Sequence, residues 1–223
     1  MPIDDASTRL AEIREKIARA AQLAGRPPES VELIAISKMQ DAAAIRPLID
    51  AGQRVFGENR VQEAAAKWPE LRETTSGIAL HLVGQLQSNK AEEAVELFDA
   101  IHSVDRHTLV HALGKAMDKT GKRPACFIHV NIGDEPQKGG CLVADLPALI
   151  AEVRAAELPL AGLMCIPPAD VEPAPYFALL AKLARDCGCS ALSMGMSNDF
   201  ETAVNIGATH VRVGTALFGT RGI

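Results

Sequence analysis

Lys38 is the residue of this sequence whose position points most directly to covalent chemistry. It follows the apolar run Val31–Ser37, which has the composition of an inner strand of a parallel sheet. A lysine at the end of such a strand projects toward the mouth of the fold. Partial burial there would disfavour the charged form and lower the pKa, which leaves an amine able to attack a carbonyl. The alternative is a lysine whose ammonium group simply reaches water.

Two glycine-containing corners late in the chain predict an anion site. The segments Ser193–Asp199 and Arg212–Ala216 each complete a short apolar run and lead into a helical pattern. Backbone N–H groups at such corners bind anions, and the hydroxyls of Ser197 and Thr215 add donors beside Gly214. The alternative is two ordinary turns, with Ser197 as a helix N-cap. An amine and an anion site on one face would together suit a ligand that carries an aldehyde and a phosphate.

Eight short apolar runs alternate with helical patterns along the chain, which is typical of βα units on a parallel sheet. At 223 residues, the chain is predicted to form one domain over residues 1–223. The expected fold is α/β, a TIM-type (β/α)8 barrel with an extra N-terminal helix; an open doubly wound sheet is the alternative. The runs are Val31–Ser37, Arg54–Gly57, Leu80–Gly84, Ala100–Val104, Cys126–Ile132, Leu160–Ile166, Ala191–Met194 and His210–Val213.

The extra helix is predicted over residues 5–24, where apolar residues recur at steps of three and four. Pro47 conflicts with the helix expected at Asp41–Ala51, because proline is tolerated only in the first turn. That helix is therefore expected to begin near Ile45 or to kink. The other expected helices are Gln62–Lys67, Glu92–Phe98, Leu109–Met117, Leu146–Ala156 and Tyr176–Arg185.

Ligands bind at the carboxyl ends of barrel strands, so further candidate residues are those that end the runs. Arg212 lies two residues before Gly214 and is expected to point into the barrel, either toward a ligand or toward a carboxylate of another strand. Asn59 could bond a ligand hydroxyl or cap the following helix. Met164 and Met196 fill the core or pack on a flat ring.

Composition excludes several classes of partner. The net charge is −5 and no block rich in lysine and arginine occurs, so nucleic acid is not expected. No apolar stretch of about 18 residues is present to span a membrane, and the N-terminus lacks a signal-peptide pattern. The five cysteines are irregularly spaced, which favours reduced thiols in the cytoplasm. Cys187-Gly-Cys189 lacks a second cysteine pair, so no metal site is predicted.

A series of motifs in this order resembles the pyridoxal phosphate homeostasis protein family, single-domain barrels related to the barrel domain of alanine racemase. The resemblance covers nearly the whole chain. Its motifs are Ala35-Ile-Ser-Lys38, Phe56-Gly-Glu-Asn59, Val61-Gln-Glu63, His81-Leu-Val-Gly-Gln-Leu-Gln-Ser-Asn-Lys90, Asn131-Ile-Gly-Asp-Glu-Pro-Gln-Lys-Gly139, Gly162-Leu-Met164, Ser193-Met-Gly-Met-Ser197 and Val211-Arg-Val-Gly-Thr215.

The resemblance implies pyridoxal 5′-phosphate (PLP) as the cofactor, bound to Lys38 as a Schiff base. It implies that Arg212 faces the pyridine nitrogen. The remaining implied cofactor residues are Ser197, Gly214 and Thr215 at the phosphate, and Asn59, Met164 and Met196 near the ring.

The implied function is vitamin B6 homeostasis as a carrier of PLP, without a catalytic reaction. An arginine at the pyridine nitrogen favours the unprotonated ring and weakens it as an electron sink. Alanine racemase also has an arginine there, but a second domain supplies a tyrosine base. The single tyrosine here, Tyr176, begins a helix, and no such domain is expected. A monomer is expected, with transient contact with PLP-dependent enzymes as a further partner.

Three other functions remain open at this point. The first is a PLP-dependent racemase or another PLP enzyme acting on a small amino acid. The second is an aldolase-type barrel, in which a lysine forms a Schiff base with a sugar phosphate. The third is a barrel that binds phosphate without covalent chemistry.

Overall fold

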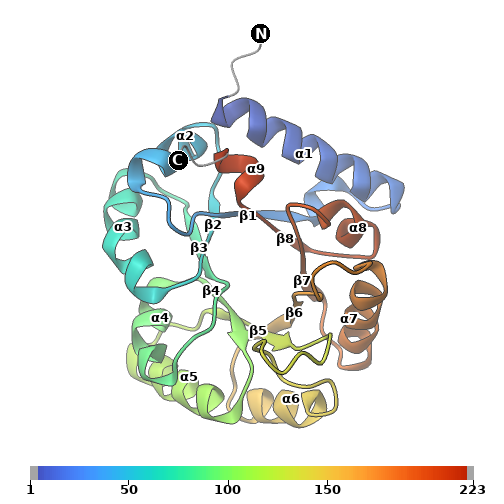
Figure 1. The fold of residues 1–223 in the computed structure, drawn as a ribbon. Helices are drawn as coiled ribbons and strands as arrows, with labels where there is room; N and C mark the ends of the chain where they lie inside the picture. Colours follow the sequence, from blue (N-terminus) through green and yellow to red (C-terminus); the bar gives the residue numbers. More distant parts are fainter. Residues whose placement is uncertain (1–4, 220–223) are drawn as a thin grey trace.

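The computed structural model describes residues 5–219 of the chain and shows a closed barrel of eight parallel strands surrounded by helices (Figure 1). The strands follow one another around the barrel in chain order, and β1 pairs with β8 to close it. This confirms the TIM-type barrel and excludes the open sheet. The strands are β1 (Glu32–Ile36), β2 (Val55–Glu58), β3 (Ala79–Leu82), β4 (Ala100–Val104), β5 (Ala125–Val130), β6 (Leu160–Cys165), β7 (Ala191–Met196) and β8 (His210–Val213).

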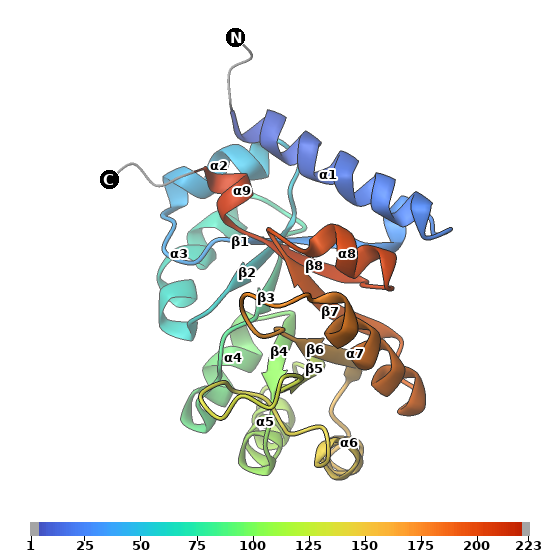
Figure 2. The ribbon, with the colours of Figure 1, turned by 45° about the vertical axis from the view of Figure 1, so that its right-hand side comes forward.

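The helices form an outer ring around the barrel, as Figures 1 and 2 show. Each βα unit buries the apolar face of its helix against the outside of the sheet, which produces one large core. Short 3-10 turns precede β1 (Pro28–Ser30) and α4 (Ser88–Lys90). The helices are α1 (Ala6–Leu23), α2 (Ala42–Asp50), α3 (Val61–Thr74), α4 (Ala91–Leu97), α5 (His107–Thr120), α6 (Leu146–Ala155), α7 (Ala174–Asp186), α8 (Phe200–Asn205) and α9 (Thr215–Phe218).

The extra N-terminal helix is confirmed as α1, which begins at the N-cap Asp5. The Asp5 carboxylate accepts a hydrogen bond of 2.8 Å from the backbone N–H of Thr8. The buried stripe of α1 lies along α8 and α9, so the helix covers the seam where the barrel closes (Figure 1).

Helix α2 differs from the expectation set by Pro47. It begins at Ala42, not near Ile45, because Asp41 caps it by accepting a 2.8 Å bond from Ala44 N–H. Pro47 lies inside the helix, which therefore lacks one backbone N–H donor at that position. The cap and the buried residues Ile45, Leu48 and Ile49 hold the helix in place despite this loss.

The inside of the barrel is unusually polar. Its apolar filling is a small cluster of Ala100, Phe127 and Met164. Buried polar side chains from several strands lie in the same interior, including His81, His102, His129, Ser193 and Arg212. Hydrogen bonds join Arg212, Ser193, His102 and His81, as described below.

Among residues 5–219, no helix has the length and apolar character needed to span a bilayer. All five cysteines are unpaired, as expected for reduced thiols. Burial raises the pKa of Cys126, Cys141 and Cys165 to about 12, so these thiols stay protonated. Within the described part of the chain, no group of three or more metal-ligating side chains occurs, Cys187 and Cys189 included.

Candidate functional site

A cavity of about 270 Å³ opens at the carboxyl ends of the strands, between β1, β7 and β8. Seven of the eight residues predicted to bind a ligand line it; Met164 does not. The cavity combines an amine, a guanidinium, hydroxyls and an apolar wall, a donor set that fits an aldehyde-bearing ring with a phosphate. The lining residues are Ile36, Lys38, Asn59, Val83, Ile166, Met196, Ser197, Arg212, Gly214 and Thr215.

Lys38 lies in a turn two residues beyond the end of β1, and its side chain is exposed. The expectation of partial burial is therefore wrong. The strand ends at Ile36, so Lys38 stands in the following turn, Lys38–Met39, at the mouth of the cavity that it lines. Met39 adopts a positive φ of 59°, which sharpens this turn.

The backbone beside Lys38 is fixed by a buried ionic network that sequence reasoning missed. Ser37 donates its hydroxyl to the Glu58 carboxylate across 2.5 Å and its backbone N–H to the Gly57 carbonyl across 2.9 Å. Glu58 also accepts a 2.9 Å bond from the indole N–H of Trp68 and pairs with the Lys67 ammonium at 2.9 Å. Lys67 in turn donates to the Ser37 carbonyl at 2.8 Å. Ser37, the residue before Lys38, is thus hydrogen-bonded to β2 through its hydroxyl and backbone N–H and to α3 through its carbonyl.

The two glycine-containing corners meet, as their positions after neighbouring strands predicted. The backbone N of Gly214 lies 3.5 Å from the Ser197 hydroxyl, and Thr215 lines the same cavity. Gly195 allows this approach, because its φ is +93° and an added Cβ would lie 2.6 Å from the Cβ of Ala203. Hydroxyls and a backbone N–H therefore face one small volume, which is the arrangement that binds a phosphate.

Arg212 is buried and points into the barrel, as its alternation with Gly214 predicted. Its guanidinium donates to the Ser193 hydroxyl at 2.7 Å and to the Cys165 carbonyl at 2.9 Å. Within residues 5–219 it pairs with no carboxylate, which removes one of its two interpretations. Burial lowers the pKa of Arg212, opposed by the neighbouring Cys165 and Asp199, but an arginine stays protonated at neutral pH. Its charge is thus available at the floor of the cavity.

Asn59 lines the cavity and does not cap a helix. The N-cap of α3 is Arg60, and no side-chain hydrogen bond closes that helix end. Asn59 can lie this close to the third strand end because residue 84 is glycine: a Cβ at residue 84 would lie 2.2 Å from the Asn59 carbonyl oxygen. The amide of Asn59 is therefore placed to contact a ligand.

The two methionines lie in different places. Met196 is exposed at the cavity. Met164 is buried inside the barrel, where it packs with Ala100 and Phe127. It lies on β6 beside Ser193 of β7, one layer below the cavity.

A second cavity of about 280 Å³ adjoins the first and shares Asn59, Val83 and Ile166 with it. It adds two groups that can exchange protons, His129 and Lys138. Burial lowers the pKa of His129 to about 4, so its imidazole is neutral near pH 7.

Comparison with known proteins identifies the family to which this chain belongs. Residues 8–222 match the family model "Alanine racemase, N-terminal domain". The pyridoxal phosphate homeostasis protein of Pseudomonas aeruginosa is 42% identical over 226 residues, covering 95% of this chain and 94% of that protein. The protein of the same name from Escherichia coli strain K12 is 40% identical, covering 98% of each.

Solved structures show the same fold. PipY of Synechococcus elongatus with PLP bound is 41% identical, with a TM-score of 0.85 over 96% of this chain and 100% of that chain. An alanine racemase of Clostridium difficile has a TM-score of 0.70 at 13% identity, covering 99% of this chain but 58% of that one, so the likeness is one of fold. This chain therefore belongs to the family of pyridoxal phosphate homeostasis proteins, within the alanine racemase N-terminal domain family.

Proposed function

We propose that this protein binds PLP and holds it as a Schiff base on Lys38 without catalysing a reaction of its own. The observation that carries the proposal is that Lys38, Arg212, Ser197, Gly214 and Thr215 line one cavity. The Lys38 amine would add to the aldehyde carbon, and the carbonyl oxygen would leave as water. The resident cofactor supplies the aldehyde; the protein supplies the amine and the surrounding donors.

The other residues of the cavity have separate tasks in this proposal. The hydroxyls of Ser197 and Thr215 and the N–H of Gly214 would hold the phosphate. The Arg212 guanidinium, a donor with no acceptor capacity, would face the ring nitrogen and keep it unprotonated. Asn59 and the Met196 side chain would contact the ring, and Met164 would support it from below.

A carrier role is supported by the composition of the cavity wall. Apart from Lys38, which is assigned to the cofactor, the described residues that line the cavity include no carboxylate, imidazole or phenol that could act as a general base. A general base must lie within about 3 Å of the proton it removes. An exposed lysine at an open rim suits loading and release of PLP to recipient enzymes. The unpaired cysteines further support a cytoplasmic setting.

The proposal is tested by borohydride reduction of the PLP-loaded protein followed by peptide mass spectrometry. Reduction traps a Schiff base, so a pyridoxyl mass on Lys38 is expected. The Lys38→Ala variant should carry no such mass and should lose the visible absorbance band. Lys115→Ala, which removes an exposed lysine of α5, is the matched control and should behave as the wild type. A pyridoxyl mass on another lysine in the wild type would refute the assignment.

One observation favours a second function, a racemase-like enzyme. His129 and Lys138 line the adjoining cavity, and both could exchange a proton with a bound amino acid. Incubation of the PLP-loaded protein with single enantiomers of alanine separates the two functions. No change in enantiomer ratio over hours supports the carrier, whereas steady turnover that disappears in His129→Gln supports the enzyme.

A further inference from the structure

A column of buried polar side chains runs through the barrel from the cofactor cavity toward the opposite mouth. Its members come from strands far apart in the sequence: Arg212 on β8, Ser193 on β7, His102 on β4, His81 on β3 and Glu32 at the start of β1. Ser193 and His102 have no exposed surface, and Arg212 and His81 are 4% and 6% exposed.

Short contacts join the members of the column. Arg212 donates to the Ser193 hydroxyl at 2.7 Å, and that hydroxyl lies 2.9 Å from Nδ1 of His102. Nε2 of His102 lies 3.1 Å from Nδ1 of His81. The His102 ring is also stacked on Phe127, with centroids 4.1 Å apart, which fixes its plane.

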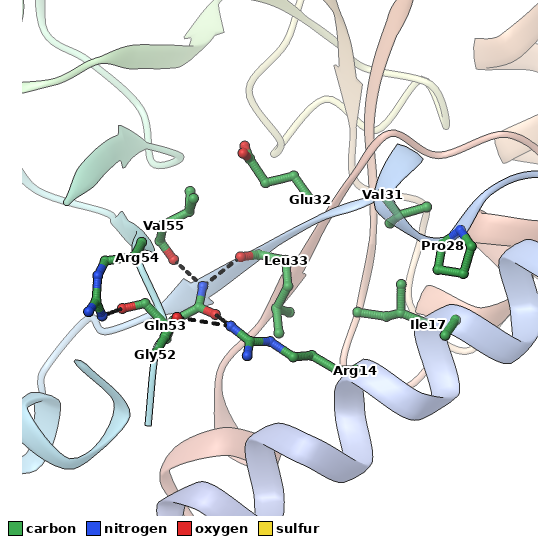
Figure 3. Close-up of a pocket in the computed structure, with 11 residues that line it drawn as sticks. Arg14, Ile17, Pro28, Val31, Glu32, Leu33, Gly52, Gln53, Arg54 and Val55 are labelled. Atoms are coloured by element: carbon green, nitrogen blue, oxygen red, sulfur yellow. Dashed lines mark hydrogen bonds between the residues drawn. The ribbon is translucent and has the colours of Figure 1, made fainter. Parts of the chain in front are cut away.

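The column ends at a carboxylate that borders a separate cavity. Glu32 Oε2 lies 4.0 Å from Nε2 of His81 and 3.4 Å from Nε2 of His210. Glu32 is among the residues that line a cavity of about 440 Å³ at the amino ends of β1 and β2, and Figure 3 shows its carboxylate directed away from Arg14 and Gln53, across β1. A separation of 4.0 Å suits a bridging water, and the Glu32 side chain, which is 41% exposed, is open to solvent.

The histidines of the column are neutral. Burial lowers the pKa of His81 to about 4. Burial, followed by the nearby His81, His210 and Arg212, lowers the pKa of His102 well below its usual range. Each ring therefore carries one N–H and one acceptor nitrogen, so the hydrogen bonds of the column must share one direction.

The direction follows from the two ends. Arg212 can only donate, so the Ser193 oxygen accepts from it. Within the described residues, the hydrogen bonds of Ser193 Oγ are those with Arg212 and His102, so its own proton finds an acceptor only at His102 Nδ1. His102 then donates from Nε2 to His81 Nδ1, and His81 directs its Nε2–H toward the Glu32 carboxylate. In the opposite direction the Ser193 proton would have no acceptor among these side chains. The lone pair of His81 Nε2 would also face the Glu32 carboxylate, which is unfavourable.

We propose that Ser193, His102 and His81 are positioning residues that hold Arg212 at the cofactor through a hydrogen-bonded relay that runs from Arg212 to His81 and points toward Glu32. This inference rests on the proposed function, since Arg212 matters there as the partner of the cofactor ring. Loss of one member leaves the next side chain without a hydrogen-bond partner in a buried site. A substitution at any of these positions should therefore disturb the position of the Arg212 guanidinium.

The first test needs no cofactor. The ¹⁵N resonances of the histidine rings in the wild-type protein should show His81 and His102 neutral at pH 7, each with its proton on Nε2. In Ser193→Ala the Nδ1 resonance of His102 should shift, because its donor is gone. Protonation of His102 on Nδ1 in the wild type would overturn the relay even if PLP binds at Lys38 as proposed.

The second test measures PLP affinity. Ser193→Ala and His102→Phe should each raise the dissociation constant about tenfold, the effect of one hydrogen bond to a charged group. His102→Phe keeps a ring to stack on Phe127. Ser103→Ala is the matched control, because Ser103 is a buried barrel serine of β4 whose hydroxyl has no hydrogen-bond partner within residues 5–219. It should stay within twofold of the wild type.

The outcomes separate the two proposals. If the wild type fails to bind PLP on Lys38, the proposed function fails, and the ring resonances still decide the relay. If the wild type binds PLP but Ser193→Ala and His102→Phe match Ser103→Ala in affinity, the positioning role is refuted.

Discussion

Ser37 and Glu58 share a 2.5 Å hydrogen bond that joins the end of β1 to the end of β2 directly beside Lys38. The Glu58 carboxylate is fully buried, and its counter-charge, Lys67, is 10% exposed. The loop that presents the amine is therefore held by a charge pair with little access to water, and this has measurable consequences.

Glu58→Gln should lower the free energy of unfolding by about 3 kcal/mol, because the Lys67 charge would lose its fully buried counter-charge and keep the partly exposed Glu63 carboxylate. Urea denaturation of the apoprotein measures the change. Glu63→Gln is the control: it removes the second carboxylate that bonds Lys67, but from a side chain that is 28% exposed. It should cost about 1 kcal/mol or less. Equal losses for the two variants would contradict this account.

Arg212→Glu should change how the absorbance of the bound cofactor depends on pH between about pH 6 and 9. A carboxylate at the ring nitrogen favours its protonated form, whereas arginine opposes it. The measurement is a series of spectra of the PLP-loaded protein across this range. Arg14→Glu, which alters the cavity at the other end of the barrel, should leave the spectra unchanged. Spectra of Arg212→Glu that superimpose on the wild type would refute contact with the ring.

The stability of the apoprotein should fall as the pH is lowered from about 6.5 to 4. Burial lowers the pKa of His81, His129 and His210 to about 4, so the unfolded chain binds more protons than the folded one in this window. Each histidine contributes up to about 1.4 kcal/mol per pH unit there. Glu32, whose pKa burial raises, acts in the opposite sense but is a single group.

Urea denaturation at several pH values measures this slope. His129→Phe should make this slope smaller by about the uptake of one proton, because it removes one buried histidine. A slope that is the same in the wild type and His129→Phe would show that His129 is protonated in the folded state.

Gly195→Ala should destabilise the protein and weaken its affinity for inorganic phosphate. The φ of +93° is unfavourable for alanine, and the new Cβ would meet the Cβ of Ala203 at 2.6 Å. Gly77→Ala isolates the backbone contribution, because its φ is +76° and nothing lies within 4 Å of an added Cβ. Gly77→Ala should cost about 1 kcal/mol and Gly195→Ala at least about 2 kcal/mol. Thermal denaturation and phosphate titration provide the measurements, and equal costs would exclude a clash at residue 195.

The sequence allowed the barrel and most of the cavity to be predicted because both depend on local signals. Alternating apolar runs define the strands, and fold topology then places the ends of β1, β7 and β8 on one face. This was enough to bring Lys38, Ser197, Arg212 and Gly214 together.

Features that depend on contacts between distant segments escaped prediction. The exposure of Lys38 follows from where β1 ends, and the start of α2 follows from the Asp41 cap overriding Pro47. The Glu58 network and the histidine column unite residues of several strands, and a single sequence carries no spacing signal for such pairs.

The exposure of the Lys38 side chain in the turn after β1 has a kinetic consequence. Hydrolysis of a linkage on that nitrogen requires one water molecule, which an exposed side chain can receive from solvent. In the function proposed above, handover of the cofactor needs no opening of a lid. The rate of handover is then set by hydrolysis of the linkage to Lys38 and by the affinity of the site for the phosphate group. It should therefore vary with pH and phosphate concentration more than with solvent viscosity.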